Sequence, residues 1–369
     1  MNGNAQNIPS IGKSNQLEIA NWNLYWFGKT QTGYGPSNDS LQLRLIHSVI
    51  LESNIDIWAL NEICNVDSFQ SLVSKLPEYQ GVISDAFPEQ KTGLIFKKSL
   101  FDLISNRSIG TENKDSFSTS RYPLEIALIP KDDIGIDTLF LIILHLKSNF
   151  GNDSLKTLAY NSRKRSSEWL KMELNKTYSN RNCIVLGDWN DDIDKSVFQG
   201  LPSPFVNLQY SDFNFYFNSQ ILSKNNIPTT TSYSEAIDHQ LISSKLKKKY
   251  KNDSTFVFRL DRHILSYSQT CSDHYPVYSF YNTYSTSTKK LESNYTWKLF
   301  PNPSHNKIQI KDINGNCEVT LYNHLGIKIF EDKIYTGEAI DCSAFQNGFY
   351  FLKIESDTIR KQYQVQIIH

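Results

Sequence analysis

Polar side chains of the kinds that bind metal ions or transfer protons interrupt or end short apolar runs in this chain. The clusters are Asn21-Trp22-Asn23, Asn61-Glu62, Gly187-Asp188-Trp189-Asn190 and Ser272-Asp273-His274. A charged or amide group that follows a core strand directly is costly to bury unless it is paired or binds something. One such cluster alone is more often a solvated turn or a cap, but their combination predicts a binding face at strand ends.

Together the clusters form an oxygen-rich set of carboxylates, carboxamides and histidines. Such a set suits a hard cation, for which we expect Mg²⁺, with Mn²⁺ or Ca²⁺ as alternatives. A phosphate ester is the substrate class that fits it. Hydrolysis of such an ester needs a cation to neutralise developing charge, a group that orients or deprotonates water, and donors around the non-bridging oxygens.

A competing motif starts at Asp188, where the sequence matches the opening of an EF-hand calcium loop. That loop requires Gly at its sixth position and a bidentate Glu at its twelfth, and the chain has Ile193 and Gln199 there. The EF-hand interpretation therefore fails. We expect the acidic residues 191–194 to form a solvated loop, with a secondary ion site as the alternative.

The elements that must position these residues follow from hydrophobic patterning. Residues 17–281 alternate short apolar runs with amphipathic stretches, which predicts an α/β domain with strands packed under helices. The predicted strands are 17–24, 56–63, 93–97, 124–129, 138–146 and 183–187, and the predicted helices are 41–52 and 162–174. Residues 282–296 are polar and predict a linker, and residues 297–369 predict short strands in a small all-β sandwich.

Composition excludes several classes of protein. The 369 residues include 38 basic and 38 acidic side chains, so no global field attracts nucleic acid or an anionic membrane. The longest nearly unbroken apolar run, 139–144, is far too short for a transmembrane helix. The five cysteines contain no CxxC pair, which argues against a zinc ribbon or a disulfide-dense scaffold.

Six motifs, in this order, resemble the metal-dependent endonuclease/exonuclease/phosphatase superfamily, to which deoxyribonuclease I belongs. The motifs are NWNL at 21–24, Glu62, HLKSN at 145–149, GDWN at 187–190, IDHQLIS at 237–243 and SDHYP at 272–276. Each is weak alone, but their ordered occurrence is specific. The resemblance implies two packed β-sheets flanked by helices, a deoxyribonuclease I-like four-layer sandwich, with the site at one rim.

The resemblance also implies roles for individual residues. Asp188 would orient or activate the attacking water, and Asn190 would hold a phosphate oxygen. His274 would contact the phosphate and transfer protons, with Asp273 fixing its tautomer. His145 lies where the family often has a phosphate-contacting histidine.

For the metal, the resemblance implies that Glu62 is a ligand, with Asn23 beside it and Asp238 as a further carboxylate. Residues expected to contact the substrate are Arg121, as a bidentate phosphate clamp, Lys147 and Asn149. We expect His239, next to Asp238, to be structural or to support the site from behind.

The HLKS and GDWND segments are most similar to bacterial secreted nucleases. The expected function is therefore Mg²⁺-dependent hydrolysis of nucleic acid, with a DNA endonuclease favoured and a monomer expected. The alternative is a phospholipid or inositol phosphate hydrolase, because the core motifs do not separate these substrates. A binding module that has lost activity is a third interpretation, against which the retained Glu62, Asp188, Asn190 and His274 argue.

The last segments of the chain, LFPNPS at 299–304, LYNHLGIKIF at 321–330 and GFYFLKI at 348–354, resemble the sorting domain of the type IX secretion system. This implies contact with that machinery and a secreted or cell-surface protein; an immunoglobulin-like or carbohydrate-binding module is the alternative. Residues 1–10 have no features of an export signal, and the simplest hypothesis is that the natural signal precedes them. After export, Cys317 and Cys342 could pair.

Overall fold

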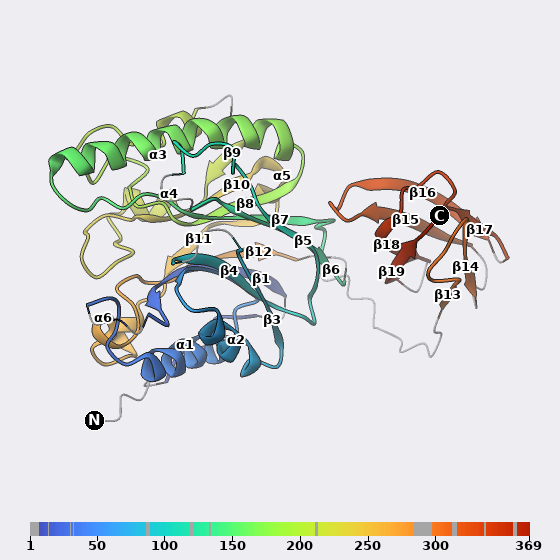
Figure 1. Cartoon of the computed structure of the whole chain (residues 1–369), viewed down its shortest axis with the longest axis horizontal. Coiled ribbons are helices and arrows are strands. Elements are labelled where there is room, and N and C mark those ends of the chain that lie inside the picture. Colours follow the sequence, from blue (N-terminus) through green and yellow to red (C-terminus); the bar gives the residue numbers. More distant parts are fainter. Residues whose placement is uncertain are drawn as a thin grey trace.

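The computed structural model describes residues 7–13, 15–29, 31, 33–85, 89–117, 121–132, 134–210, 213–283, 297–311, 316–335, 337–356 and 360–369. In the larger, N-terminal part, two six-stranded sheets face each other and helices cover their outer faces (Figure 1). The first sheet contains, in spatial order, β11 (Tyr250–Val257), β12 (Val277–Asn282), β1 (Gln16–Phe27), β2 (Ile57–Ile63), β4 (Lys91–Lys97) and β3 (Tyr79–Ile83). The second contains β5 (Phe101–Ser108), β6 (Leu124–Pro130), β7 (Leu139–His145), β8 (Asn182–Asp188), β10 (Asp238–Ser243) and β9 (Phe215–Phe217).

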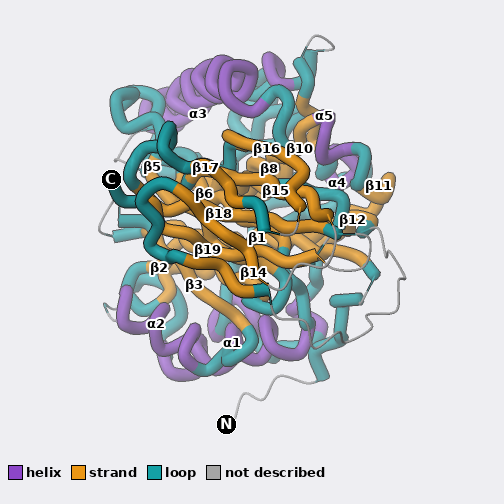
Figure 2. Tube along the Cα trace, turned by 90° about the vertical axis from the view of Figure 1, so that its right-hand side faces the viewer, coloured by secondary structure: helices purple, strands orange, loops and turns teal. Residues whose placement is uncertain are grey.

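Helices cover both outer faces of this sandwich. The longer helices are α1 (Asp39–Ser53) and α2 (Val66–Ser74), on the first sheet, and α3 (Asp153–Glu173), on the second (Figures 1 and 2). A π-helical turn, Leu174–Tyr178, extends α3. Short helices are α4 (Gln220–Lys224), α5 (Ser244–Lys247) and α6 (Tyr267–Thr270), and two 3₁₀ turns span Val206–Leu208 and Leu260–Arg262.

Alternation along the strands builds three apolar layers. In β1, Leu17 and Ile19 face the second sheet, whereas Ala20 and Trp22 face α1. The β7, β8 and β10 strands send every second side chain into the same inter-sheet layer. A third layer joins the second sheet to α3. Successive side chains of a strand point to opposite faces, so each strand serves two layers.

The structure confirms the predicted fold class of two packed sheets flanked by helices, followed by a small all-β domain. Each predicted strand coincides with one of β1, β2, β4, β6, β7 and β8. Helix α3 begins at Asp153 rather than 162, because Leu155 and Leu158 are 52% and 63% exposed and obscure the amphipathic pattern. No described helix is long and apolar enough to cross a membrane.

The C-terminal part contains two sheets. One has the order β13 (Lys298–Phe300), β14 (Lys307–Lys311) and β17 (Ala339–Asp341); the other has the order β16 (Lys328–Tyr335), β15 (Asn316–Asn323), β18 (Gly348–Glu355) and β19 (Arg360–Ile367). The predicted Cys317–Cys342 pairing is wrong, since both thiols are free and buried. From residue 284 on, the predicted linker 282–296 lies outside the described residues.

The C-terminal domain contacts the larger domain at one end of the second sheet. Tyr322 and Phe351 pack against Ile129, at the end of β6. This end holds the beginning of β7, whereas His145 is the last residue of β7. With a rise of about 3.3 Å per residue, the two ends of β7 are roughly 20 Å apart.

Candidate active site

At one rim of the sandwich, the layer between the sheets changes from apolar to polar. In β7 the inward positions Leu141 and Ile143 are followed by His145, and in β8 Ile184 and Leu186 are followed by Asp188. The strand period of two therefore points these last side chains toward the facing sheet. Register places them side by side, because Asp188 is paired with His145 of β7 and with Asp238 of β10.

The facing sheet contributes the remaining groups at the same rim. Asn23 of β1 is paired with Asn61 of β2, and Glu62 follows directly. The segment that carries His274 leads into β12, whose first residue, Val277, pairs with Asn21 of β1. Residues far apart in the sequence therefore meet where the two sheets end together.

Three residues at this rim have backbone conformations with positive φ. Gly187 has φ +133°, and a Cβ at this position would lie 2.2 Å from the carbonyl oxygen of Leu144, so only glycine fits in GDWN. Glu62 and Asn190 have φ values of +60° and +56°. Non-glycine residues in this region are strained and concentrate at functional sites.

Asn23 bridges the two carboxylates nearest the centre of the site. Its Nδ2 donates to Glu62 Oε1 at 3.2 Å and to Asp188 Oδ2 at 3.0 Å, and its Oδ1 accepts from the Tyr25 amide at 2.9 Å. The Nδ2 side of the Asn23 amide therefore faces the two carboxylates and donates a hydrogen bond to each. The second oxygen of Glu62 accepts from the Trp26 amide at 2.9 Å.

Burial and mutual repulsion raise the pKa values of these carboxyl groups. Burial, followed by the charge of Asp273, raises the pKa of Glu62. For Asp188, burial raises the pKa to about 7, aided by the charges of Asp238 and Glu62 and opposed by His274. Asp188 is thereby poised to exchange a proton near neutral pH.

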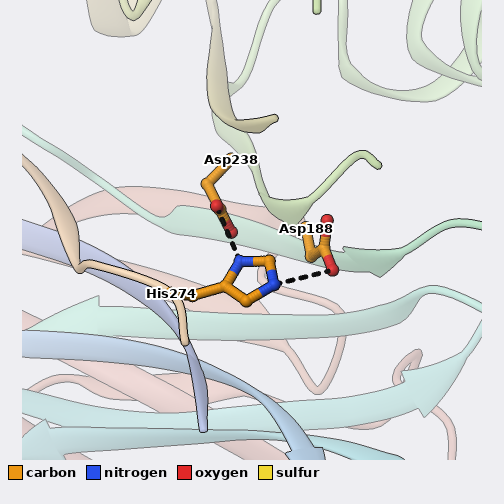
Figure 3. A group of neighbouring side chains, drawn as sticks. All are labelled: Asp188, Asp238 and His274. Carbon is orange, nitrogen blue, oxygen red and sulfur yellow. Dashed lines mark hydrogen bonds and ion pairs between the residues drawn. The ribbon is translucent and has the colours of Figure 1, made fainter. Parts of the chain in front are cut away.

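His274 lies between two carboxylates (Figure 3). Its Nδ1 is 2.9 Å from Asp238 Oδ2, and its Nε2 is 4.0 Å from Asp188 Oδ2. Burial alone would lower the pKa of His274, but the charges of Asp238 and Asp188 outweigh it and hold the pKa well above its usual value. The site therefore stabilises the imidazolium form.

The carboxylate that orients His274 is Asp238, and the expectation that Asp273 does so is corrected. The hydrogen-bond partner of His274 Nδ1 is Asp238 Oδ2, at 2.9 Å. Asp273 Oδ1 is buried and has no hydrogen-bond partner among the described residues. Its charge raises the pKa of Glu62 and also favours the imidazolium form of His274, to which it contributes less than Asp238 and Asp188 do.

His145 and Arg121 form the third part of the site. The Nη1 of Arg121 lies 2.8 Å from His145 Nε2, which is also 3.6 Å from the nearest oxygens of Glu62 and Asp188. Burial, together with the charge of Arg121, lowers the pKa of His145 well below its usual value. The neutral ring can thus accept from the guanidinium and hold it at the rim.

The other predicted substrate contacts lie in the loops that follow β7 and β8. Burial and the charge of Arg121 lower the pKa of Lys147, so these two cations are neighbours. Asn149 Oδ1 is buried without a hydrogen-bond partner among the described residues. Asn190 donates from its backbone to Asp188 Oδ1 at 2.9 Å and from Nδ2 to the Leu146 carbonyl at 3.1 Å, which ties the two loops together.

A buried ion pair that the sequence did not reveal supports these loops. Arg163 of α3 donates to Asp191 Oδ2 from Nε and Nη2, at 3.0 and 2.9 Å, and to the Lys147 carbonyl from Nη1, at 2.7 Å. The prediction of a solvated loop at 191–194 is wrong for Asp191 and Asp192, which are buried. The spacing of Arg163 with Ser167 and Leu170, which places all three on the buried face of α3, is the sequence signal from which the burial of Arg163 could have been predicted.

His239 has the structural role expected for it. Its Nδ1 lies 3.1 Å from Ser219 Oγ and its Nε2 lies 2.9 Å from the Ala236 carbonyl. Both ring nitrogens are therefore engaged within the fold, away from the groups at the rim.

The donor set fits a divalent cation. The charge of Asp273 raises the pKa of Glu62, and the charge of Asp238 raises the pKa values of Asp188 and Asp273. The buried Oδ1 atoms of Asp238 and Asp273 have no partner among the described residues. A bound cation would relieve this repulsion. Ligand atoms of Asp188, Asp238 and His274 also lie within 4.8 Å of one another, close enough to hold an ion.

The sandwich and its rim of carboxylates, imidazoles and cationic groups define a metal-dependent hydrolase acting on phosphodiester bonds. The chain belongs to the Endonuclease/Exonuclease/phosphatase family, whose model matches residues 20–274. A second model, the Secretion system C-terminal sorting domain, matches residues 298–369. The protein is therefore secreted or located at the cell surface through the type IX pathway.

Solved structures share the fold at low sequence identity. A humanized D. rerio TDP2 is 17% identical with a TM-score of 0.55, over 73% of this chain and 100% of that chain. The human nocturnin catalytic domain is 18% identical with a TM-score of 0.50, over 73% and 94%. A 3′-5′ exonuclease from Neisseria meningitidis is 17% identical with a TM-score of 0.50, over 72% and 100%. A search of curated proteins found no match.

Proposed function

We propose that this chain is a secreted Mg²⁺-dependent phosphodiesterase that hydrolyses nucleic acid, with DNA as the substrate and internal cleavage as the mode. The observation that carries the proposal is the row formed by Asp238, His274 and Asp188 beside Glu62. The His274 and Glu62 side chains keep 11% and 12% exposure, so they can meet a substrate at the rim. The names of structural relatives, TDP2 and a 3′-5′ exonuclease, support nucleic acid as the substrate class.

Glu62 and Asp273 are the residues that would hold the cation. Their charges act on each other, and Asp273 keeps a buried oxygen without a partner among the described residues. Asp238 is committed to His274 through Oδ2, which makes it a positioning group for the imidazole rather than the main metal ligand. When bound, the cation supplies positive charge that neutralises the developing negative charge on the phosphate oxygens.

Asp188 accepts the proton of the attacking water. Its Oδ1 is held by the Asn190 amide and its Oδ2 by Asn23 Nδ2, so the carboxylate cannot rotate freely. A carboxyl group whose pKa is about 7 retains affinity for a proton and is about half ionised in neutral solution, which is the compromise a general base needs.

The cationic groups of the site bind the negatively charged oxygens of the phosphate. His274, kept protonated by Asp238, donates from Nε2 toward the phosphate oxygens. Arg121 and Lys147 lie on the other side of the site and bind non-bridging oxygens, as preorganised donors do in phosphoryl transfer. Asn190 and Asn149 add amide donors from the two loops.

A substrate panel tests this proposal. Supercoiled plasmid, single-stranded DNA, RNA, sphingomyelin and an inositol phosphate are each incubated with Mg²⁺ and with chelator. We expect Mg²⁺-dependent conversion of supercoiled plasmid to nicked circles. Release of phosphocholine or inorganic phosphate, with plasmid intact, would reassign the enzyme to lipid or inositol phosphate hydrolysis.

A further inference from the structure

An aromatic pair lies next to the catalytic carboxylates and has no part in the mechanism above. The Trp26 and Tyr34 rings are 4.7 Å apart between centroids, with an edge-to-face angle of 64°. Trp26 is attached directly to the site, because its backbone amide donates to Glu62 Oε2 at 2.9 Å. We name this pair the aromatic shelf.

Backbone geometry fixes the shelf at this place. Tyr25 and Trp26 have φ values of +51° and +56°, and the pairing of β1 with β2 shifts register between Asn23 and Phe27. Such bulges re-aim side chains next to active sites. Gly35 has φ +63°, and a Cβ there would lie 2.7 Å from the Tyr25 carbonyl oxygen, so the two backbone segments of the shelf are in close contact.

The shelf does not serve the hydrophobic core. Trp26 is half-buried and Tyr34 is 39% exposed, and neither belongs to the described residues that pack between the first sheet and its helices. Two large aromatic side chains that stay partly in water, one of them, Trp26, on strained backbone, forfeit the free energy that their burial would contribute. Their position beside Glu62 therefore points to a ligand.

A positive charge accompanies the two rings. The Lys29 ammonium lies 5.9 Å from the Trp26 ring centroid and 5.4 Å from that of Tyr34. π-faces for stacking with a nearby cation match a nucleotide, which has a flat base and an anionic phosphate. A phospholipid or inositol headgroup offers the phosphate but has no ring to stack.

We propose that the aromatic shelf stacks a nucleobase of the substrate next to the phosphate that is cleaved, with Lys29 near the adjoining backbone phosphate. This inference rests on the proposed nuclease function and narrows it. A base can stack on a side chain only when it is unpaired, so the shelf favours single-stranded or locally opened nucleic acid.

The test compares cleavage of a single-stranded oligothymidylate by the full-length wild type and by Tyr34→Ala. Loss of one base–aromatic contact should lower kcat/KM roughly 5- to 150-fold, mainly through KM. Tyr34→Phe, which keeps the ring, should restore the wild-type value. The matched control is Tyr216→Ala. Tyr216 is 41% exposed, and the Lys247 ammonium lies 3.4 Å from its ring centroid, so its surroundings resemble those of Tyr34. Tyr216 lies on the edge strand β9, and its loss should not affect cleavage.

An oligomer in which tetrahydrofuran abasic units replace the nucleosides separates stacking from a general disturbance of the site. On this substrate the kcat/KM of the wild type should be lower by a similar factor than on oligothymidylate, and Tyr34→Ala should not lower it further. If Tyr34→Ala lowered kcat/KM by the same factor on both substrates, the inference would be overturned. An unchanged KM of Tyr34→Ala on oligothymidylate would also overturn it. In those cases wild-type cleavage still supports the nuclease, whereas a wild type that cleaves no nucleic acid refutes both.

Discussion

His274 Nδ1 lies 2.9 Å from Asp238 Oδ2, although the two residues are 36 positions apart in the sequence. The pairing follows from β10, which sets Asp238 directly opposite Asp188, and from the segment before β12, which brings His274 between these two carboxylates. An imidazole flanked in this way is both oriented and charged. The arrangement brings the proposed proton donor, His274, and the proposed proton acceptor, Asp188, into one group of residues.

Without the charge of Asp238, His274 should lose its proton at a lower pH than in the wild type. In Asp238→Asn the pKa of His274 should fall, because the strongest favourable charge and its hydrogen bond to the imidazolium are lost. Activity should fall by roughly 10²–10⁴-fold, the range for loss of a proton-transfer group. An NMR titration of His274 measures the pKa, with Asp273→Asn as the comparison. A larger shift in Asp273→Asn than in Asp238→Asn would show that the wrong carboxylate has been assigned.

Stabilisation by Mg²⁺ should depend on pH. The fold raises the pKa of Asp188 to about 7, so the folded state holds this proton more tightly than the unfolded chain. Ionisation of Asp188 therefore costs stability, progressively between the unfolded value near 4 and about 7, and fully above that. Because Mg²⁺ competes with protons for the carboxylate cluster, the rise in Tm on adding Mg²⁺ should be larger at about pH 8 than at about pH 5.5.

Thermal unfolding with Mg²⁺ and with chelator measures this effect. In Asp188→Asn the pH dependence of the Mg²⁺-induced rise in Tm should be weaker, because one of the titrating carboxyl groups of the cluster is gone while Glu62 and Asp273 remain. A rise in Tm that is equal at both pH values in the wild type would contradict the account of the carboxylate cluster.

Arg163 should be needed for stability as well as for activity. Its side chain and that of Asp191 are fully buried, so Arg163→Ala leaves an uncompensated carboxylate. The expected loss is about 3–5 kcal/mol in the free energy of unfolding, with a higher KM because the Lys147 loop loses its anchor. Chemical denaturation measures the loss. The double variant Arg163→Met with Asp191→Asn should recover part of it, and no recovery would argue against the ion pair as the cause.

The sorting domain should be dispensable for catalysis. It contacts the Ile129 end of the second sheet, whereas the active site lies at the opposite strand ends, roughly 20 Å away. Cleavage of the chain within 284–296 should leave kcat/KM unchanged within about twofold. A loss of tenfold or more after clean removal would indicate that the domain supports the site.

Much of the fold was predictable because strands that are covered on both faces form nearly continuous apolar runs, as in LFLIILH of β7. β1, β2, β7 and β8 were all predicted, whereas the sheet edges β3, β5, β9 and β11 were not. Edge strands have a solvent side and carry polar residues, as in YKNDSTFV of β11, which weakens the pattern.

The residue types at the site were predictable, but their contacts were not. The motifs identified Glu62, Asp188 and His274, which the structure brings together. The choice of Asp238 over Asp273 as the partner of His274 depends on the register between β8 and β10, a long-range property that no local pattern encodes. The burial of Asp191 depends in the same way on α3 crossing the loop.

The initial rate of plasmid nicking with Mg²⁺ tests the central claim most directly, measured for the wild type, Asp188→Asn and a matched control, Asp261→Asn. Asp261 is partly exposed and pairs with Arg259 outside the site. The account predicts that Asp188→Asn loses about 10²–10⁴-fold in rate while the control stays within twofold. Nicking by Asp188→Asn at the wild-type rate, or nicking by the wild type in chelator, would contradict a metal-dependent hydrolase that uses Asp188 as its base.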